Sequence, residues 1–270
     1  MTRAKQASGK QGTLIIIGGH EDHDGDKIIL KEVASRIRNG KLVLATVASH
    51  EPEGYLEKYQ ASFAELGIGE VTELYVEDRV EASDAGKLQA LDEVEAVFFS
   101  GGDQLRITSQ IGGTPIFDRV KAIYEAGGTI AGTSAGASMM SDTMLVKGTS
   151  GASFRIGDVR MAPGLGLLSN VIIDQHFAER GRIGRLIGAV SQNPRELGIG
   201  IDEDTAIVVE GEQFRVIGSG AVYLVDAYGA THSDVAEADS RTTLSIHDLT
   251  LHVLSTGDKF DLVTRRPHRP

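Results

Sequence analysis

The chain has 270 residues and no cysteine, and its 38 acidic and 27 basic residues give a formal net charge of −11. The length allows one large buried core, while the missing cysteines exclude disulfides, thiolate metal sites and a cysteine nucleophile. The acidic balance argues against a nucleic-acid partner, which requires a concentrated basic face, and is compatible with a cationic substrate.

The first half of the chain alternates apolar runs with amphipathic stretches, which predicts strands followed by helices. The predicted strands are Leu14–Ile17, Leu42–Val47, Val71–Val76, Ala96–Phe99 and Thr129–Ala131. The predicted helices are Asp26–Arg38, Glu53–Leu66, Ala85–Leu91 and Pro115–Ala126. This alternation predicts an α/β fold with a mostly parallel central sheet and helices on both faces.

After residue 195 short strands separated by glycine-containing turns predict an antiparallel extension of the sheet. They are Leu197–Ile201, Ala206–Glu210, Phe214–Ile217, Ala221–Asp226 and Thr250–Leu254. Without a visible linker, we expect a flexible tail over residues 1–12 and one domain over residues 13–270. The polar, basic segment Met1–Gln11 and the shortness of every apolar run predict a cytoplasmic protein with no membrane partner.

A Gly-x-Ser-x-Gly motif, Gly132–Gly136, directly follows the last of the parallel strands. Such a motif turns a strand sharply into a helix and exposes the hydroxyl of its serine, here Ser134. The N–H groups that begin the following helix are free to face an oxyanion, which suggests that of Ala135. Because small residues also occur in ordinary turns, the motif alone leaves a structural role open.

A nucleophilic serine requires a base, and His176 follows the strand-like run Val171–Ile173 within the sequence Asp-Gln-His-Phe. Polar residues at the carboxyl end of a strand lie where open α/β sheets bind ligands. The acid that orients the histidine is sought in the run Asp202–Asp204, with Asp174 as a competitor, because spacing does not choose between them. A capping or turn role remains the alternative for both runs.

Two further segments suggest substrate contacts. Ser100–Gln104 ends another apolar strand, and its glycines could direct a backbone N–H toward a substrate oxygen or merely form a tight turn. The arginines of the Arg-Gly-Arg-Ile-Gly-Arg run, residues 180–185, could bind carboxylates in bidentate fashion or form a solvated helix face. The loop Gly18–Asp26 resembles a metal loop but lacks a recognised ligand spacing, so we interpret it as a polar loop.

Taken in order, these motifs resemble the cyanophycinases, in the peptidase E-like group of serine peptidases, over about residues 13–263. The resemblance implies a class I glutamine amidotransferase-like sheet and a Ser–His–Glu triad at Ser134, His176 and Glu203. It also implies hydrolysis of cyanophycin, a poly-aspartate with arginine on each β-carboxyl, to β-Asp-Arg dipeptides by a homodimer without metal or cofactor. The mechanism places the N–H groups of Gly102 and Ala135 at the oxyanion. The implied substrate pocket contains Gln104, Asp174, Gln175, Arg180, Arg182 and Arg185.

Two other functions share some of these features. An α-aspartyl dipeptidase of the peptidase E type has the same triad and needs no pocket for an arginine side chain. A non-catalytic ligand-binding domain predicts that serine-directed electrophiles fail to label Ser134. The Ser–His–acid order itself disfavours the α/β-hydrolases, in which the acid precedes the histidine.

Overall fold

The computed structural model describes residues 11–50, 52–147, 159–237 and 242–268. Most of the predicted tail, residues 1–10, lies outside the described residues. Gly12 is already buried, and its N–H donates to the carbonyl of Tyr124 at 2.9 Å. Regular structure begins at Thr13 with the first strand.

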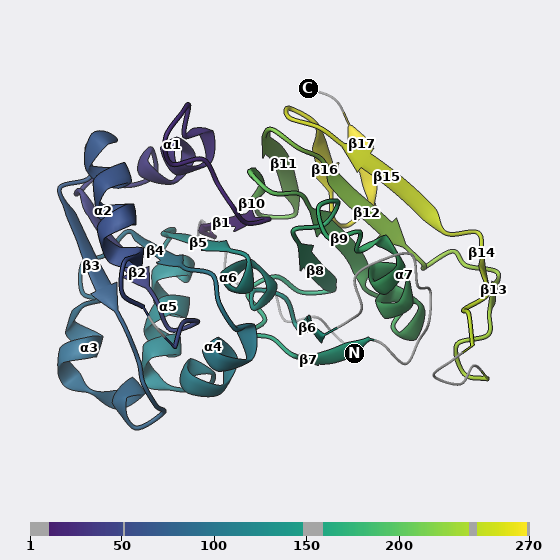
Figure 1. The fold of residues 1–270 in the computed structure, drawn as a ribbon, viewed down its shortest axis with the longest axis horizontal. Helices are drawn as coiled ribbons and strands as arrows, with labels where there is room; N and C mark the ends of the chain where they lie inside the picture. The colour runs from purple at the N-terminus through teal and green to yellow at the C-terminus, as the bar shows by residue number, and fades with distance from the viewer. Residues whose placement is uncertain (1–10, 51, 148–158, 238–241, 269–270) are drawn as a thin grey trace.

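A nine-stranded sheet has the order β17-β16-β11-β10-β1-β5-β4-β2-β3 (Figure 1). Its parallel strands are β1 (Thr13–Ile17), β5 (Thr129–Thr133), β4 (Ala96–Phe99), β2 (Lys41–Ala45) and β3 (Glu70–Leu74). Its antiparallel strands are β10 (Thr205–Glu210), β11 (Gln213–Gly218), β16 (Lys259–Asp261) and β17 (Arg266–His268). The predicted α/β class is confirmed, because apolar parallel strands are buried by helices on both faces.

Two buried cores lie on opposite faces of this sheet. One contains side chains of α1 (Ile28–Ala34) and α2 (Tyr55–Glu65). The other contains side chains of α4 (Gln104–Ile111), α5 (Pro115–Glu125) and α6 (Ala135–Ser138), with α3 (Ala85–Gln89) at its edge. Helix α4 was not predicted. It begins where the side chain of Asp103 accepts a hydrogen bond from the N–H of Leu105.

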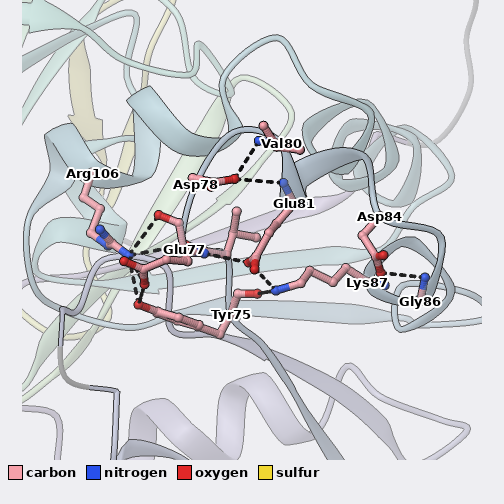
Figure 2. Close-up of polar contacts among 10 residues, drawn as sticks. Tyr75, Glu77, Asp78, Val80, Glu81, Asp84, Gly86, Lys87 and Arg106 are labelled. Carbon is pink, nitrogen blue, oxygen red and sulfur yellow. Dashed lines mark hydrogen bonds and ion pairs between the residues drawn. The ribbon is translucent and has the colours of Figure 1, made fainter.

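The loop after β3 is tied to α3 and α4 by polar contacts (Figure 2). Arg106 of α4 donates to the hydroxyl of Tyr75 at 2.9 Å and to the carboxylate of Glu77 at 3.2 Å. Lys87 of α3 donates to the carbonyl of Tyr75 at 2.6 Å and to the carboxylate of Glu81 at 2.7 Å. These contacts hold the loop, α3 and α4 together. Helix α4 begins at Gln104, two residues after Gly102.

The predicted antiparallel extension was partly wrong, because the C-terminal strands divide between two sheets. A four-stranded sheet has the order β15-β12-β9-β8, with β8 (Val171–Gln175), β9 (Leu197–Ile201), β12 (Val222–Asp226) and β15 (Thr250–Leu254). Strands β8 and β9 are parallel and joined through α7 (Ile183–Gln192), so β9 pairs with β8 and β12 and not with β10.

The four-stranded sheet and α7 lie on the opposite side of the molecule from α2, α3 and β3 (Figure 1). Two short strand pairs and a 3₁₀ helix, η1 (Glu81–Ser83), complete the described elements. The pairs are β6 (Thr143–Lys147) with β7 (Arg160–Pro163), and β13 (His232–Ser233) with β14 (Ile246–His247). Among the described helices, none is long and apolar enough to cross a membrane.

Candidate active site

Ser134 occupies the sharp turn between β5 and α6. Its φ of 53° and ψ of −109° fall outside the regions that side chains favour, as a strained nucleophile turn requires. A Cβ on Gly132 would lie 2.3 Å from the carbonyl oxygen of Gly136, and one on Gly136 would lie 2.4 Å from that of Phe99. Both glycines are therefore required by close backbone contact, and the serine between them stays partly exposed.

The side chains of Ser134, His176 and Glu203 form one hydrogen-bonded series. His176 Nε2 lies 2.9 Å from Ser134 Oγ, and His176 Nδ1 lies 2.6 Å from Glu203 Oε1. His176 directly follows β8 and Glu203 comes soon after β9, so the base and the acid extend from adjacent parallel strands of the four-stranded sheet. The serine comes from the other sheet. The contact between the two sheets therefore assembles the series.

Gly18 and Gly19, at the carboxyl end of β1, are the link between the two sheets. The carbonyl of Gly18 accepts the N–H of His176, and the carbonyl of Gly19 accepts the N–H of Asp204, both at 2.8 Å. A Cβ on Gly19 would lie 2.2 Å from Cε1 of His176, so the imidazole packs directly on this glycine. The position of the histidine therefore depends on a residue without a side chain.

Burial lowers the pKa of His176 below 6.5. The hydrogen bond with Glu203 acts in the opposite direction, and the positive charge of Arg180 lowers the pKa further. The imidazole is therefore neutral near pH 7. A neutral ring that directs Nε2 at Ser134 can accept the proton of the serine.

The Gly102 loop lies beside Ser134. A Cβ on Gly101 would lie 3.5 Å from the Cβ of Ser134. Gly102 has a φ of 141°, and its own Cβ would lie 2.3 Å from the carbonyl oxygen of Ala48, so only glycine fits. Within the described residues, the N–H groups of Gly102 and Ala135 donate to no backbone carbonyl. Both are available to a substrate oxygen.

Four of the six residues expected in the substrate pocket form a buried network at the end of β8. Arg185 Nε donates to Asp174 Oδ2 at 2.6 Å, and Arg182 Nη1 donates to Asp174 Oδ1 at 3.2 Å. Arg182 also donates to the side chain and the carbonyl of Gln175. Burial is the main cause that lowers the pKa of Arg182 to about 10. The carboxylate of Asp174 is thus paired with these arginines and does not contact the histidine ring as its orienting acid.

The other two expected contacts are more open. Arg180 is exposed on the loop that follows His176. Gln104 is partly exposed at the first turn of α4, and its Nε2 donates to the carbonyl of Leu145 at 2.7 Å. A hollow of about 780 Å³ adjoins this helix and is lined in part by Asp103 and Arg106.

Comparison with known proteins decides the family. The model of peptidase family S51 matches residues 14–217. The chain belongs to peptidase family S51. It is a serine-type peptidase, and the resemblance drawn from its motifs is confirmed.

Curated relatives of this S51 peptidase match over most of its length. The cyanophycinase of Synechococcus elongatus is 37% identical over 265 residues, which cover 97% of this chain and 82% of the relative. That of Geminocystis herdmanii is 36% identical over 261 residues, covering 95% and 96%. That of Trichormus variabilis is 38% identical over 256 residues, covering 93% and 86%.

Solved structures share the fold of this S51 peptidase. A peptidase from an acI-B1 Actinobacterium has a TM-score of 0.71 at 20% identity, covering 94% of this chain and 98% of that one. A putative peptidase E from Listeria monocytogenes has a TM-score of 0.51 at 15% identity, covering 78% and 100%. At these identities the likeness concerns the fold.

The sequence did not reveal the role of Glu21 in the S51 peptidase. This buried carboxylate accepts a hydrogen bond from Thr133 Oγ1 at 2.6 Å, and Thr133 directly precedes the nucleophile. The hydroxyl of Tyr59 donates to the same carboxylate. Burial acts to raise the pKa of Glu21, but hydrogen bonds from His23, Thr133 and Tyr59 outweigh it and lower the pKa. The signal present in the sequence was an acidic residue two positions after the glycines that end a central strand.

The remainder of the Gly18–Asp26 loop is a turn closed by Asp22. Its carboxylate accepts the N–H groups of Asp24, Gly25 and Lys27 at 2.8–2.9 Å. These bonds lower the pKa of Asp22 to about 2. The loop thus holds itself in shape through a local carboxylate, as a polar loop does.

Proposed function

We propose that this S51 peptidase hydrolyses cyanophycin to β-Asp-Arg dipeptides through an acyl-enzyme. The observation that carries the proposal is the series Ser134–His176–Glu203, with distances of 2.9 and 2.6 Å, in a chain 37% identical to a cyanophycinase.

In the proposed mechanism Ser134 Oγ attacks the backbone carbonyl carbon of an aspartyl residue, and His176 Nε2 takes the serine proton. Glu203 holds the proton on Nδ1 and stabilises the imidazolium. The N–H groups of Gly102 and Ala135 stabilise the oxyanion. His176 then gives its proton to the leaving amine as the C–N bond breaks. Water next attacks the acyl carbon while His176 takes its proton, and His176 returns that proton to Ser134 as the ester bond breaks.

The proposed substrate pocket lies beside this series. Arg180, exposed beside His176, pairs with a free α-carboxylate of the substrate. Gln104 and Gln175 offer carboxamide oxygens to a guanidinium group. The network of Asp174 with Arg182 and Arg185 holds Gln175 in place and completes the pocket wall. A cytoplasmic location and a homodimer complete the proposal.

The test is an incubation of the purified protein with insoluble cyanophycin and, separately, with Asp-X dipeptides, followed by product analysis by mass spectrometry. We expect β-Asp-Arg from the polymer and none from the Ser134→Ala variant. Cleavage of Asp-X dipeptides with the polymer intact would instead identify an α-aspartyl dipeptidase. No cleavage of either substrate, together with no labelling of Ser134 by a fluorophosphonate, would identify a ligand-binding domain.

A further inference from the structure

His20 is a residue that the proposed mechanism does not use, although it lies against the site. Its side chain is 70% exposed, and its Nδ1 lies 3.8 Å from Glu203 Oε2. Its ring meets that of His176 edge to face, with the centroids 5.3 Å apart. His20 has a φ of 50°, so the turn after Gly19 directs the histidine back toward the site.

His20, His176 and Glu203 together form a set of metal donors. One donor atom from each residue lies within 4.8 Å of the other two, and no other such set of three occurs among the described residues. Two imidazoles and one carboxylate are the three protein ligands of many zinc sites that keep an open fourth position. Nitrogen donors favour zinc over the hard cations magnesium and calcium.

We propose that His20, His176 and Glu203 bind Zn²⁺ and that the bound ion reversibly inhibits the peptidase. The inhibitory part rests on the proposed role of His176 as the base, whereas the binding part does not. Zinc–ligand bonds of about 2.0–2.2 Å place tetrahedral donors roughly 3.4 Å apart. The exposed side chain of His20 shortens its 3.8 Å distance to Glu203 by rotating toward it, and the 2.6 Å distance between His176 Nδ1 and Glu203 Oε1 widens as zinc replaces the proton between them.

The inhibition follows from the proton balance of His176. Its Nδ1 faces Glu203, so zinc takes the place of the Nδ1 proton, which moves through solvent to Nε2. The ring stays neutral and presents an N–H to Ser134 Oγ in place of a lone pair. It can then no longer accept the serine proton. The positive charge of Arg180 near His176 weakens metal binding, as a reversible site requires.

The first experiment measures Zn²⁺ binding by isothermal titration of the wild type and the His20→Asn variant. Asparagine tolerates the positive φ at this position and is a poor zinc ligand. We carry both in a His232→Ala background, since the rings of His232 and His247 lie with their centroids 4.6 Å apart and this pair offers zinc a competing surface site. We expect binding to weaken at least about tenfold, since even loss of a ligand's outer hydrogen-bond partner has effects of this size. Equal affinities, or no binding by either protein, overturn the site.

The second experiment measures the rate at which a fluorophosphonate labels Ser134 as ZnCl₂ is added. We expect zinc to slow labelling of the wild type, EDTA to restore it, and MgCl₂ to have no effect. His20→Asn needs at least about tenfold more zinc for the same slowing. Equal zinc responses of the two proteins contradict the inhibition. Labelling that is absent even without metal contradicts the proposed function, while the titration still decides zinc binding.

Discussion

The two halves of the candidate active site differ in how the fold makes them. The nucleophile side, around Ser134, is shaped by backbone contacts among residues within a few positions of the motif and with the two neighbouring strands β1 and β4. The base side, His176 and Glu203, depends on the parallel pairing of β8 with β9 and on contact with Gly18 and Gly19, which lie far away in sequence. The nucleophile is therefore a local feature and its activation a tertiary one.

This difference indicates where small changes have large effects. On the nucleophile side, removal of Ser134 Oγ is expected to abolish peptide hydrolysis. On the base side, a single methyl group at the junction of the two sheets can displace the imidazole. Five substitutions, together with two control variants, separate these two kinds of effect.

The largest expected effect belongs to Ser134→Ala. Removal of the nucleophile from a serine peptidase triad lowers kcat by about 10⁶-fold. We expect the turn between β5 and α6 to keep its fold, because alanine is smaller than serine. Initial rates of β-Asp-Arg release measure the loss, and a thermal melt checks the fold. A variant that releases product at the normal rate would show that another nucleophile acts.

Glu203→Gln and Asp174→Asn compare the two carboxylates of the base side. Glu203→Gln removes the charge that orients His176, and we expect kcat to fall by about 10⁴-fold with stability little changed. Asp174→Asn leaves Arg182 and Arg185 without their carboxylate, and breaking such a buried pair destabilises by about 3–5 kcal/mol. Urea unfolding and kcat are measured for both. A greater kcat loss in a still-folded Asp174→Asn variant contradicts Glu203 as the orienting acid.

Gly19→Ala tests the junction between the sheets. The added Cβ would lie 2.2 Å from the ring of His176, and we expect kcat to fall by about 10²-fold as the imidazole shifts. Gly67→Ala is the matched control, because Gly67 also has a positive φ, of 84°, but its Cβ would meet no atom within 4 Å. Equal kcat values in the two variants would show that the methyl group at Gly19 does not displace the imidazole. Steady-state rates at saturating substrate give the answer.

Arg180→Ala has the smallest expected effect on kcat; it removes the proposed contact with the substrate carboxylate and shifts the pH dependence. The arginine charge lowers the pKa of His176, so its removal raises that pKa. The acid limb of kcat/KM, where the imidazole becomes protonated, then moves to higher pH. Arg180→Lys keeps the charge and leaves the limb in place, although it weakens substrate carboxylate binding. A limb that stays unmoved in Arg180→Ala would show that burial, Glu203 and Arg182 set the pKa of His176 without Arg180.

The periodicity of the sequence located the five parallel strands and most of their helices, because burial on one or both faces leaves a local pattern. It missed α4, whose apolar positions Ile107 and Ile111 are separated by polar residues and whose start is a side-chain cap at Asp103. The pattern also predicted β9 and β10 in one sheet, whereas the structure places them in two. An apolar run has the same pattern in either sheet.

The sequence by itself predicted the turn at Ser134, because the two glycines that the turn requires and the serine lie within five consecutive residues. It also determined that a histidine and carboxylates follow other strands. Only the tertiary structure decided between the carboxylates: Asp174 is completely buried against two arginines, whereas Glu203 Oε1 lies 2.6 Å from His176 Nδ1. The physical reason is that spacing along a chain does not fix distances in space. Those distances follow from strand pairing and packing between residues far apart in sequence.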